Sequence, residues 1–126
     1  MKIAITLVRV LLGLAFVVFG ANIFLHFLPM KPPTPPPPLA MDFSKALMDS
    51  HYMLVVGALQ FMGGLLLLIG RYVPLGLTLL GPVIVNILLF HIFLEPKGLP
   101  IAILVSVLSL IVLWYHRSAF APLFKA

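Results

Sequence analysis

Four long apolar segments separated by short polar breaks dominate the pattern of this chain. They cover residues 3–28, 52–69, 74–94 and 100–115. Each is close to the length that an α-helix needs to cross the ~30 Å hydrocarbon core of a bilayer. Because lipid offers no hydrogen bonds to the backbone, such segments must be helical. The pattern therefore predicts an all-α, integral membrane four-helix bundle in a single membrane domain over residues 1–126.

The link between the first two spans, residues 29–51, differs from the other two links in length and composition. Its first part, Pro29–Pro38, is rich in proline, which predicts polyproline II or coil outside the lipid. We interpret this tract as a spacer in preference to a docking peptide for a proline-binding partner. Asp42–Ser50 is then predicted to be a short interfacial helix capped by Asp42, with its apolar face on the membrane surface or on the end of the bundle.

Composition and charge support the membrane assignment and suggest an orientation. Hydrophobic residues make up 63% of the chain and charged residues 9%, whereas soluble domains carry about 25% charged residues. Antiparallel spans place both termini and the Arg71 link on one side, with basic residues and no acid. The other side balances three lysines with three acids. The positive-inside rule then places both termini in the cytoplasm. The net charge of +5 thus reflects topology, and we expect no nucleic-acid partner.

Three amides lie within the apolar segments, where polar side chains are costly and informative. Asn22, Gln60 and Asn86 fall at similar depths below the outer surface, and Gly57 and Gly64 leave room beside Gln60. We expect the three side chains to point inward and converge in the outer half of the bundle. Two interpretations stay open: hydrogen-bonded contacts between helices, which we favour, or the polar floor of a ligand pocket.

Histidines supply the remaining candidate chemistry. His26, His51 and His91 lie near the predicted outer interface, and His26 and His91 would lie near the mouth of such a pocket. No pair of them has ligand spacing on one helix, so we expect no metal site. The chain has no cysteine, which excludes disulfide and thiol chemistry, and no catalytic residue is assigned. The candidate ligand-binding residues are Asn22, His26, Gln60, Asn86 and His91.

Several segments of the chain together form a recognisable pattern: Arg9–Leu14, Phe43–Tyr52, Gly63–Leu68, Arg71–Leu75, Gly81–His91 and Gly98–Pro100. In these segments the chain resembles the DoxX family of small four-helix membrane proteins, and Asn86–His91 is the most specific part of the similarity. The resemblance implies a bacterial inner-membrane protein, and the family takes its name from a subunit of a thiosulfate:quinone oxidoreductase. Similar sequences often carry lysine and glutamate where this chain has Gly57 and Gln60, so an ion pair there is not implied.

The favoured function is a non-catalytic accessory or scaffold subunit of a membrane redox or oxidative-stress assembly. Its expected partners are membrane lipid, redox proteins and further copies of itself, and quinone is the candidate cofactor. The alternative is a small transporter or exporter of hydrophobic compounds. Such exporters use an intramembrane acid, whereas Asp42, Asp49 and Glu95 all lie in predicted links. An enzyme acting alone is a third, less favoured reading, because no catalytic constellation is visible.

The charge pattern makes the orientation testable, because the chain contains no competing cysteine. We expect the thiol of Thr34→Cys to react with an impermeant maleimide from outside intact cells. The thiol of Ala126→Cys should react only after the cells are permeabilised. The reverse labelling pattern would overturn the charge argument.

Overall fold

The computed structural model describes residues 2–28 and 34–126, and the regular structure in these ranges is helical throughout. Among them, four helices are long and apolar enough to cross a membrane. The chain is therefore a multi-pass, all-helical protein by the length and composition of its helices. The long helices are α1 (Lys2–Leu25), α3 (Tyr52–Ile69), α4 (Val73–Phe93) and α5 (Leu99–Tyr115). The shorter elements are α2 (Pro38–Asp49), η1 (Pro96–Gly98), α6 (Arg117–Phe120) and η2 (Ala121–Phe124).

The helix boundaries agree with the predicted spans except around the long link. α1 ends at Leu25 instead of residue 28, because His26 adopts a left-handed conformation with φ of 51°. α2 begins at Pro38, four residues before the predicted cap at Asp42, so the assignment of Asp42 as the N-cap was wrong. Proline is favoured in the first turn of a helix, where its missing N–H costs nothing. The polyproline prediction for residues 29–33 lies outside the described residues, while Pro37 has polyproline-like angles of −55° and 148°.

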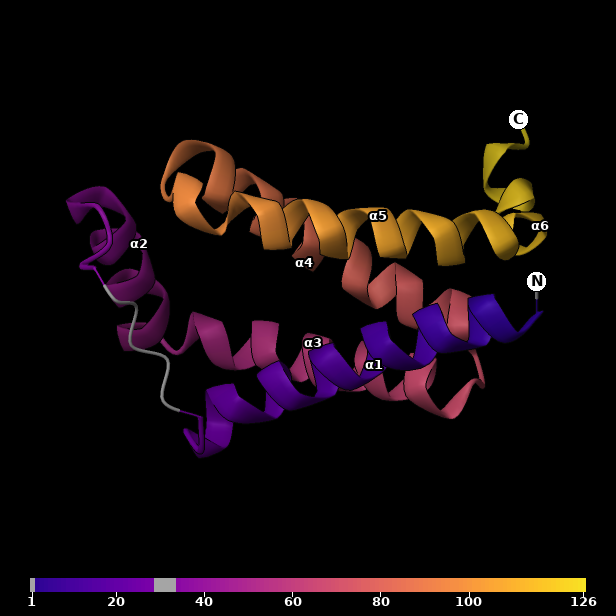
Figure 1. Ribbon diagram of the computed structural model, residues 1–126, viewed down its shortest axis with the longest axis horizontal. Coiled ribbons are helices and arrows are strands. Elements are labelled where there is room, and N and C mark those ends of the chain that lie inside the picture. Colours follow the sequence, from indigo (N-terminus) through magenta and orange to yellow (C-terminus); the bar gives the residue numbers. More distant parts are fainter. Residues whose placement is uncertain (1, 29–33) are drawn as a thin grey trace.

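The helices pack as two antiparallel pairs (Figure 1). α1 makes its most extensive contacts with α3, α3 packs next against α4, α4 against α5, and α5 returns to α1. Both chain termini lie at one end of the bundle, which we call the termini end, and α2 lies at the opposite end, which we call the α2 end (Figure 1). α2 contacts the bundle chiefly through α3. α3 is thus the helix that touches α1, α2 and α4.

α1 and α3 approach each other so closely that their backbones are in contact. A Cβ atom on Gly13 would lie 2.6 Å from the backbone nitrogen of Leu68 and 2.7 Å from the carbonyl oxygen of Gly64. One heptad further, a Cβ on Gly20 would lie 2.7 Å from the backbone nitrogen of Phe61. Small residues allow this approach in membranes, where van der Waals packing replaces the hydrophobic effect between helices.

A second glycine contact joins α3 to α4 on a different face of α3. A Cβ on Gly63 would meet the Leu80 side chain at 2.6 Å, and a Cβ on Gly76 would lie 2.9 Å from the carbonyl oxygen of Gly63. α3 therefore uses Gly64 toward α1 and Gly63 toward α4. Consecutive residues on a helix differ by about 100°, so the two neighbours of α3 meet it at an angle and enclose an interior between them.

The end of α3 near the termini is capped by a charged side chain from α1. The Arg9 guanidinium donates hydrogen bonds to the carbonyl oxygens of Leu67 and Leu68, the second at 3.4 Å. These carbonyls belong to the last turn, which carries the negative end of the helix dipole. Gly70 ends the helix with φ of +82°, and a Cβ there would lie 2.7 Å from the guanidinium. Arg9 therefore fixes the α1–α3 register at the termini end.

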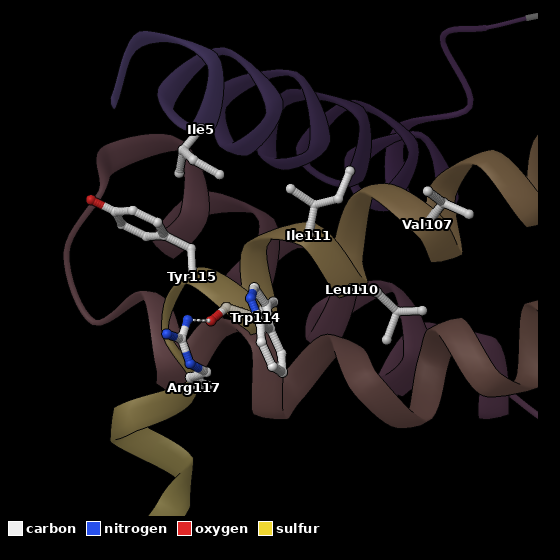
Figure 2. Close-up of a pocket in the computed structure, with 7 residues that line it drawn as sticks. All are labelled: Ile5, Val107, Leu110, Ile111, Trp114, Tyr115 and Arg117. Atoms are coloured by element: carbon white, nitrogen blue, oxygen red, sulfur yellow. Dashed lines mark hydrogen bonds between the residues drawn. The ribbon is translucent and has the colours of Figure 1, made fainter. Parts of the chain in front are cut away.

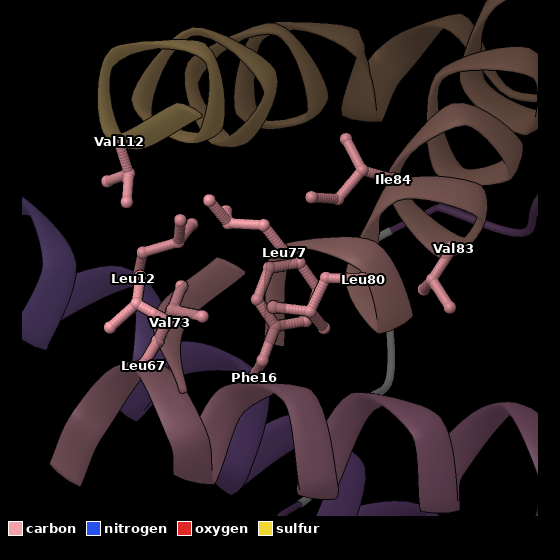
Figure 3. Packing of buried hydrophobic residues seen from close by; sticks show 9 residues of the cluster. All are labelled: Leu12, Phe16, Leu67, Val73, Leu77, Leu80, Val83, Ile84 and Val112. Atoms are coloured by element: carbon pink, nitrogen blue, oxygen red, sulfur yellow. The ribbon is translucent and has the colours of Figure 1, made fainter. Parts of the chain in front are cut away.

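The largest cluster of buried apolar side chains joins all four long helices (Figure 3). Its side chains from α1, α3 and α5 include Leu12, Leu67 and Val112, all of which are 1% exposed or less. α4 contributes most of the remainder, from Val73 to Ile84. Most of these residues lie in the half of the bundle nearest the termini, so that half is closed by conventional apolar packing.

The backbone contact at Gly64 can be tested with a matched pair of glycine substitutions. Gly64→Ala places a methyl group 2.8 Å from Val17 nitrogen, so it should lower stability by about 1–3 kcal/mol. Gly81→Ala meets nothing within 4 Å and should not lower stability, because alanine favours helix more than glycine does. Thermal unfolding in detergent, followed by circular dichroism, measures both. Equal midpoints for the two variants would contradict the close packing of α1 on α3.

Candidate functional site

Gln60 projects into the interior between α1 and α4. On α3 it lies between the face of Gly57 and Gly64, which meets α1, and the face of Gly63, which meets α4. A Cβ on Gly20 of α1 would lie 3.1 Å from the Cβ of Gln60. Leu67, one heptad further along α3, has the same direction and lies in the apolar core. Gln60 therefore points into the same interior as Leu67, roughly 10 Å along α3 toward the α2 end.

The Gln60 side chain is buried without a hydrogen-bond partner among residues 2–28 and 34–126. Its exposed fraction is 7%, which makes it one of the two buried polar residues of the described chain, together with Ser109. No described donor or acceptor side chain or carbonyl bonds its amide, and no polar side-chain atom in the described chain is both fully enclosed and unpartnered. The small exposed area of Gln60 therefore includes its amide nitrogen and oxygen. A free amide group thus borders accessible space in an apolar surrounding.

Asn22 has a different role from the predicted one. Its side-chain oxygen accepts a hydrogen bond of 2.8 Å from the backbone N–H of Leu28, and its carbonyl oxygen accepts one of 2.9 Å from His26. Both bonds close the chain as it leaves α1. Asn22 is half-buried, and its side-chain oxygen binds the chain that follows α1 instead of meeting Gln60, contrary to the expected convergence.

Asn86 faces outward from the bundle, which contradicts the predicted inward orientation. The residue is exposed, and its amide nitrogen donates a 2.7 Å hydrogen bond to the carbonyl oxygen of Pro82 on the same helix. Leu80 lies at the centre of the buried face of α4, and Asn86 is about 120° away around that helix. Because a carbonyl of its own helix satisfies the amide, Asn86 needs no partner on another helix.

The two candidate histidines lie at the α2 end but on different structures. His26 is exposed in the turn after α1. His91 is half-buried, and its Nδ1 lies 3.0 Å from the carbonyl oxygen of Glu95 in the turn before α5. Gly98 leaves space for this ring, because a Cβ there would lie 2.2 Å from His91 Cε1. His91 therefore holds the α4–α5 turn together through its ring.

The described residues contain no group of three or more histidine, cysteine, aspartate or glutamate side chains that could hold a metal ion. The two serines of α5 are also occupied locally. Ser106 and Ser109 each donate a 2.8 Å hydrogen bond to a carbonyl four residues earlier, at Ala102 and Val105. These hydroxyl groups are satisfied within their own helix, as expected for a helix-contact surface.

Two grooves on the surface were missed from the sequence, and none of the five candidate residues lines either of them. The first lies between α1 and the last turns of α5, with Trp114 and Arg117 at one end (Figure 2). The second lies between α1 and α3 over the small residues Ala21 and Ala58. A signal for the first was present in the sequence, since an interfacial tryptophan followed by arginine marks the end of a span. The capping role of Arg9 was likewise missed.

Gln60 is the one member of the five candidates that is buried in the interior between the helices. The Gln60 amide can both donate and accept hydrogen bonds, and the residues around it are apolar. This combination suits a ligand that has one polar group on an apolar body. Comparison of the chain with protein-family models, characterised proteins and solved structures gives no match. The functional interpretation of Gln60 therefore rests on its burial, its contacts and its chemistry.

The free amide of Gln60 has a consequence for stability that can be measured. A fully buried polar group without a partner costs about 1–3 kcal/mol, and an unpartnered amide in an apolar surrounding carries part of that cost, so Gln60→Leu should raise the thermal midpoint of the ligand-free protein. Asn86→Leu is the matched control, because it makes the same chemical change on the outward face and should alter stability little. A lower midpoint for Gln60→Leu would show that the amide bonds a partner within the protein.

Proposed function

We propose that this chain is a non-catalytic accessory subunit of a membrane redox assembly that holds a quinone or a similar lipid-soluble carbonyl compound at Gln60. The observation that carries the proposal is the Gln60 side chain, which is 7% exposed, makes no hydrogen bond among the described residues and leaves its amide at accessible space within the bundle. In an apolar phase such an amide is stabilised by any ligand that brings an acceptor. A quinone carbonyl is an acceptor on an apolar molecule of that kind.

The position of Gln60 supports entry of such a ligand from the membrane. Gln60 lies eight residues into α3 from Tyr52, which corresponds to a depth of roughly 12 Å. Most of the apolar core, which includes Leu12, Leu67 and Val112, lies nearer the termini end than Gln60 does. A ligand at Gln60 would therefore insert between α1 and α4 on the α2 side of that core. The ring would meet the amide, while its isoprenoid tail would remain among the lipid chains.

The accessory role follows from the chemistry available near Gln60. No cysteine is present in the chain, and the three acids lie outside the long helices: Asp42 and Asp49 in α2, and Glu95 before η1. An amide can bind and orient a quinone but cannot exchange electrons with it. Electron transfer would therefore require a partner protein. The resemblance of Gly81–His91 and neighbouring segments to the DoxX family supports the same role in a bacterial inner membrane.

The position of the acids also weighs against the transporter alternative. Proton-coupled exporters of this size rely on a carboxylate within the membrane. In this chain the described spans carry Lys2 and Arg9 on α1 and no acid, and Arg9 is committed to the carbonyl groups that end α3. The protein thus has no intramembrane acid to couple proton movement to export.

Ligand retention tests the proposal directly. The protein is purified from bacterial membranes in mild detergent, and quinone per protein is measured by extraction and mass spectrometry. Wild-type protein and Asn86→Leu should retain quinone, whereas the affinity of Gln60→Leu for quinone should fall about five- to tenfold, since one hydrogen bond from a neutral amide to a buried carbonyl contributes roughly 1–1.5 kcal/mol. Equal retention by Gln60→Leu, or no quinone in any sample, would contradict binding at Gln60.

Recovery of partner proteins tests the accessory role separately. Affinity purification of the tagged chain in the same detergent should recover membrane or peripheral redox proteins together with it. Repeated isolation of the chain alone, with no partner and no bound lipid-like molecule, would count against an accessory subunit.

A further inference from the structure

The groove at the termini end runs along the last turns of α5 and is closed on one side by α1 (Figure 2). Its volume is about 550 Å³, and its wall includes Ile5, Val107, Ile111, Trp114, Tyr115 and Arg117. Apart from Arg117 these side chains are aliphatic or aromatic. From Val107 to Tyr115 the groove follows roughly 12 Å of helix, close to the ~15 Å of hydrocarbon in one leaflet.

Arg117 stands at the end of this groove in a fixed orientation. Its guanidinium carbon lies 4.6 Å from the centre of the Trp114 ring, and its NH1 nitrogen donates a 2.9 Å hydrogen bond to the Trp114 carbonyl oxygen. The stacking on Trp114 uses one face of the guanidinium, and the hydrogen bond uses one of its N–H groups. A guanidinium has five N–H donors, so most of its donors remain available to a phosphate at the mouth of the groove.

The charges at this end of the molecule favour an anionic ligand. The three acids of the chain lie in α2 and at Glu95, at the opposite end of the bundle (Figure 1). Arg9 is occupied by the carbonyl groups that end α3. Arg117 is therefore the basic residue that lines the apolar groove and still has N–H groups available to a ligand. Trp114 and Tyr115 are residues typical of the depth at which phospholipid headgroups begin.

We propose that this groove is a binding site for one anionic phospholipid from the leaflet at the termini end. An acyl chain lies between Ile5 of α1 and Ile111 of α5, and the phosphate contacts the outer edge of the Arg117 guanidinium. A phospholipid fits the groove better than a partner helix does, because the apolar wall ends at one fixed cation. The site is separate from Gln60, which lies on α3 toward the α2 end.

Lipid competition on the intact chain tests this site. The purified protein in mild detergent is incubated with equimolar phosphatidylglycerol and phosphatidylcholine of the same acyl chains, and native mass spectrometry counts each bound lipid. Wild-type protein should retain phosphatidylglycerol about fivefold over phosphatidylcholine, the preference that one arginine confers near an anionic headgroup. Arg117→Gln should remove this preference.

Arg71→Gln is the control, because it removes the same charge from the exposed α3–α4 link, and Arg71 lines neither of the two grooves described above. It should keep the preference. Equal losses in both variants would show a general charge effect and overturn the site, as would equal binding of the two lipids to wild-type protein. A lipid-free dimer that Val107→Trp dissociates would instead show that a second copy fills the groove, which also contradicts the proposal.

Discussion

The arrangement of this bundle depends on the contact between the backbones of α1 and α3. Gly13 and Gly20 on α1 meet Gly64 and Phe61 on α3, at distances that leave no room for a Cβ atom. In a membrane the hydrophobic effect does not draw helices together, so close van der Waals contact over glycines is a main source of helix association. This contact fixes both the spacing and the rotation of α3. The direction of every other side chain on α3 follows from that rotation.

Two consequences of this rotation distinguish the ends of the bundle. Toward the termini, it brings the last carbonyls of α3 under Arg9 and places Leu67 in the apolar core. Toward α2, it turns Gln60 into the same interior, one heptad from Leu67. The same helix face thus carries a leucine where the bundle is closed and an amide where a ligand is proposed. The proposed lipid groove at Arg117 uses a different surface, so the two sites are structurally independent.

The sequence predicted the spans well because long apolar segments in lipid have one stable backbone conformation. It also predicted the direction of Gln60, since flanking glycines marked its face of α3. It failed for Asn22 and Asn86 for one reason: depth along the chain does not reveal whether an amide bonds the backbone close to it in sequence.

Two further features depend on contacts between helices that are distant in sequence. Arg9 and the end of α3 are separated by nearly sixty positions, and Ile5 and Trp114 by more than one hundred. No local pattern indicates which of several basic residues will meet a helix end. Pro38, by contrast, carried a usable local signal for the start of α2, because proline is favoured in the first turn of a helix.

The most direct measurement of the α1–α3 contact is a nuclear Overhauser experiment on the protein in detergent micelles with glycine-selective labelling. Gly13 and Gly64 each have one α-proton where another residue would carry its Cβ atom. A Cβ on Gly13 would lie 2.7 Å from the carbonyl oxygen of Gly64, and a Cβ on Gly64 would lie 2.9 Å from the carbonyl oxygen of Gly13. We expect a cross-peak between the α-protons of Gly13 and Gly64 and a second between those of Gly20 and Gly57. Cross-peaks from these protons to detergent chains alone would contradict the contact, and with it the inward direction of Gln60.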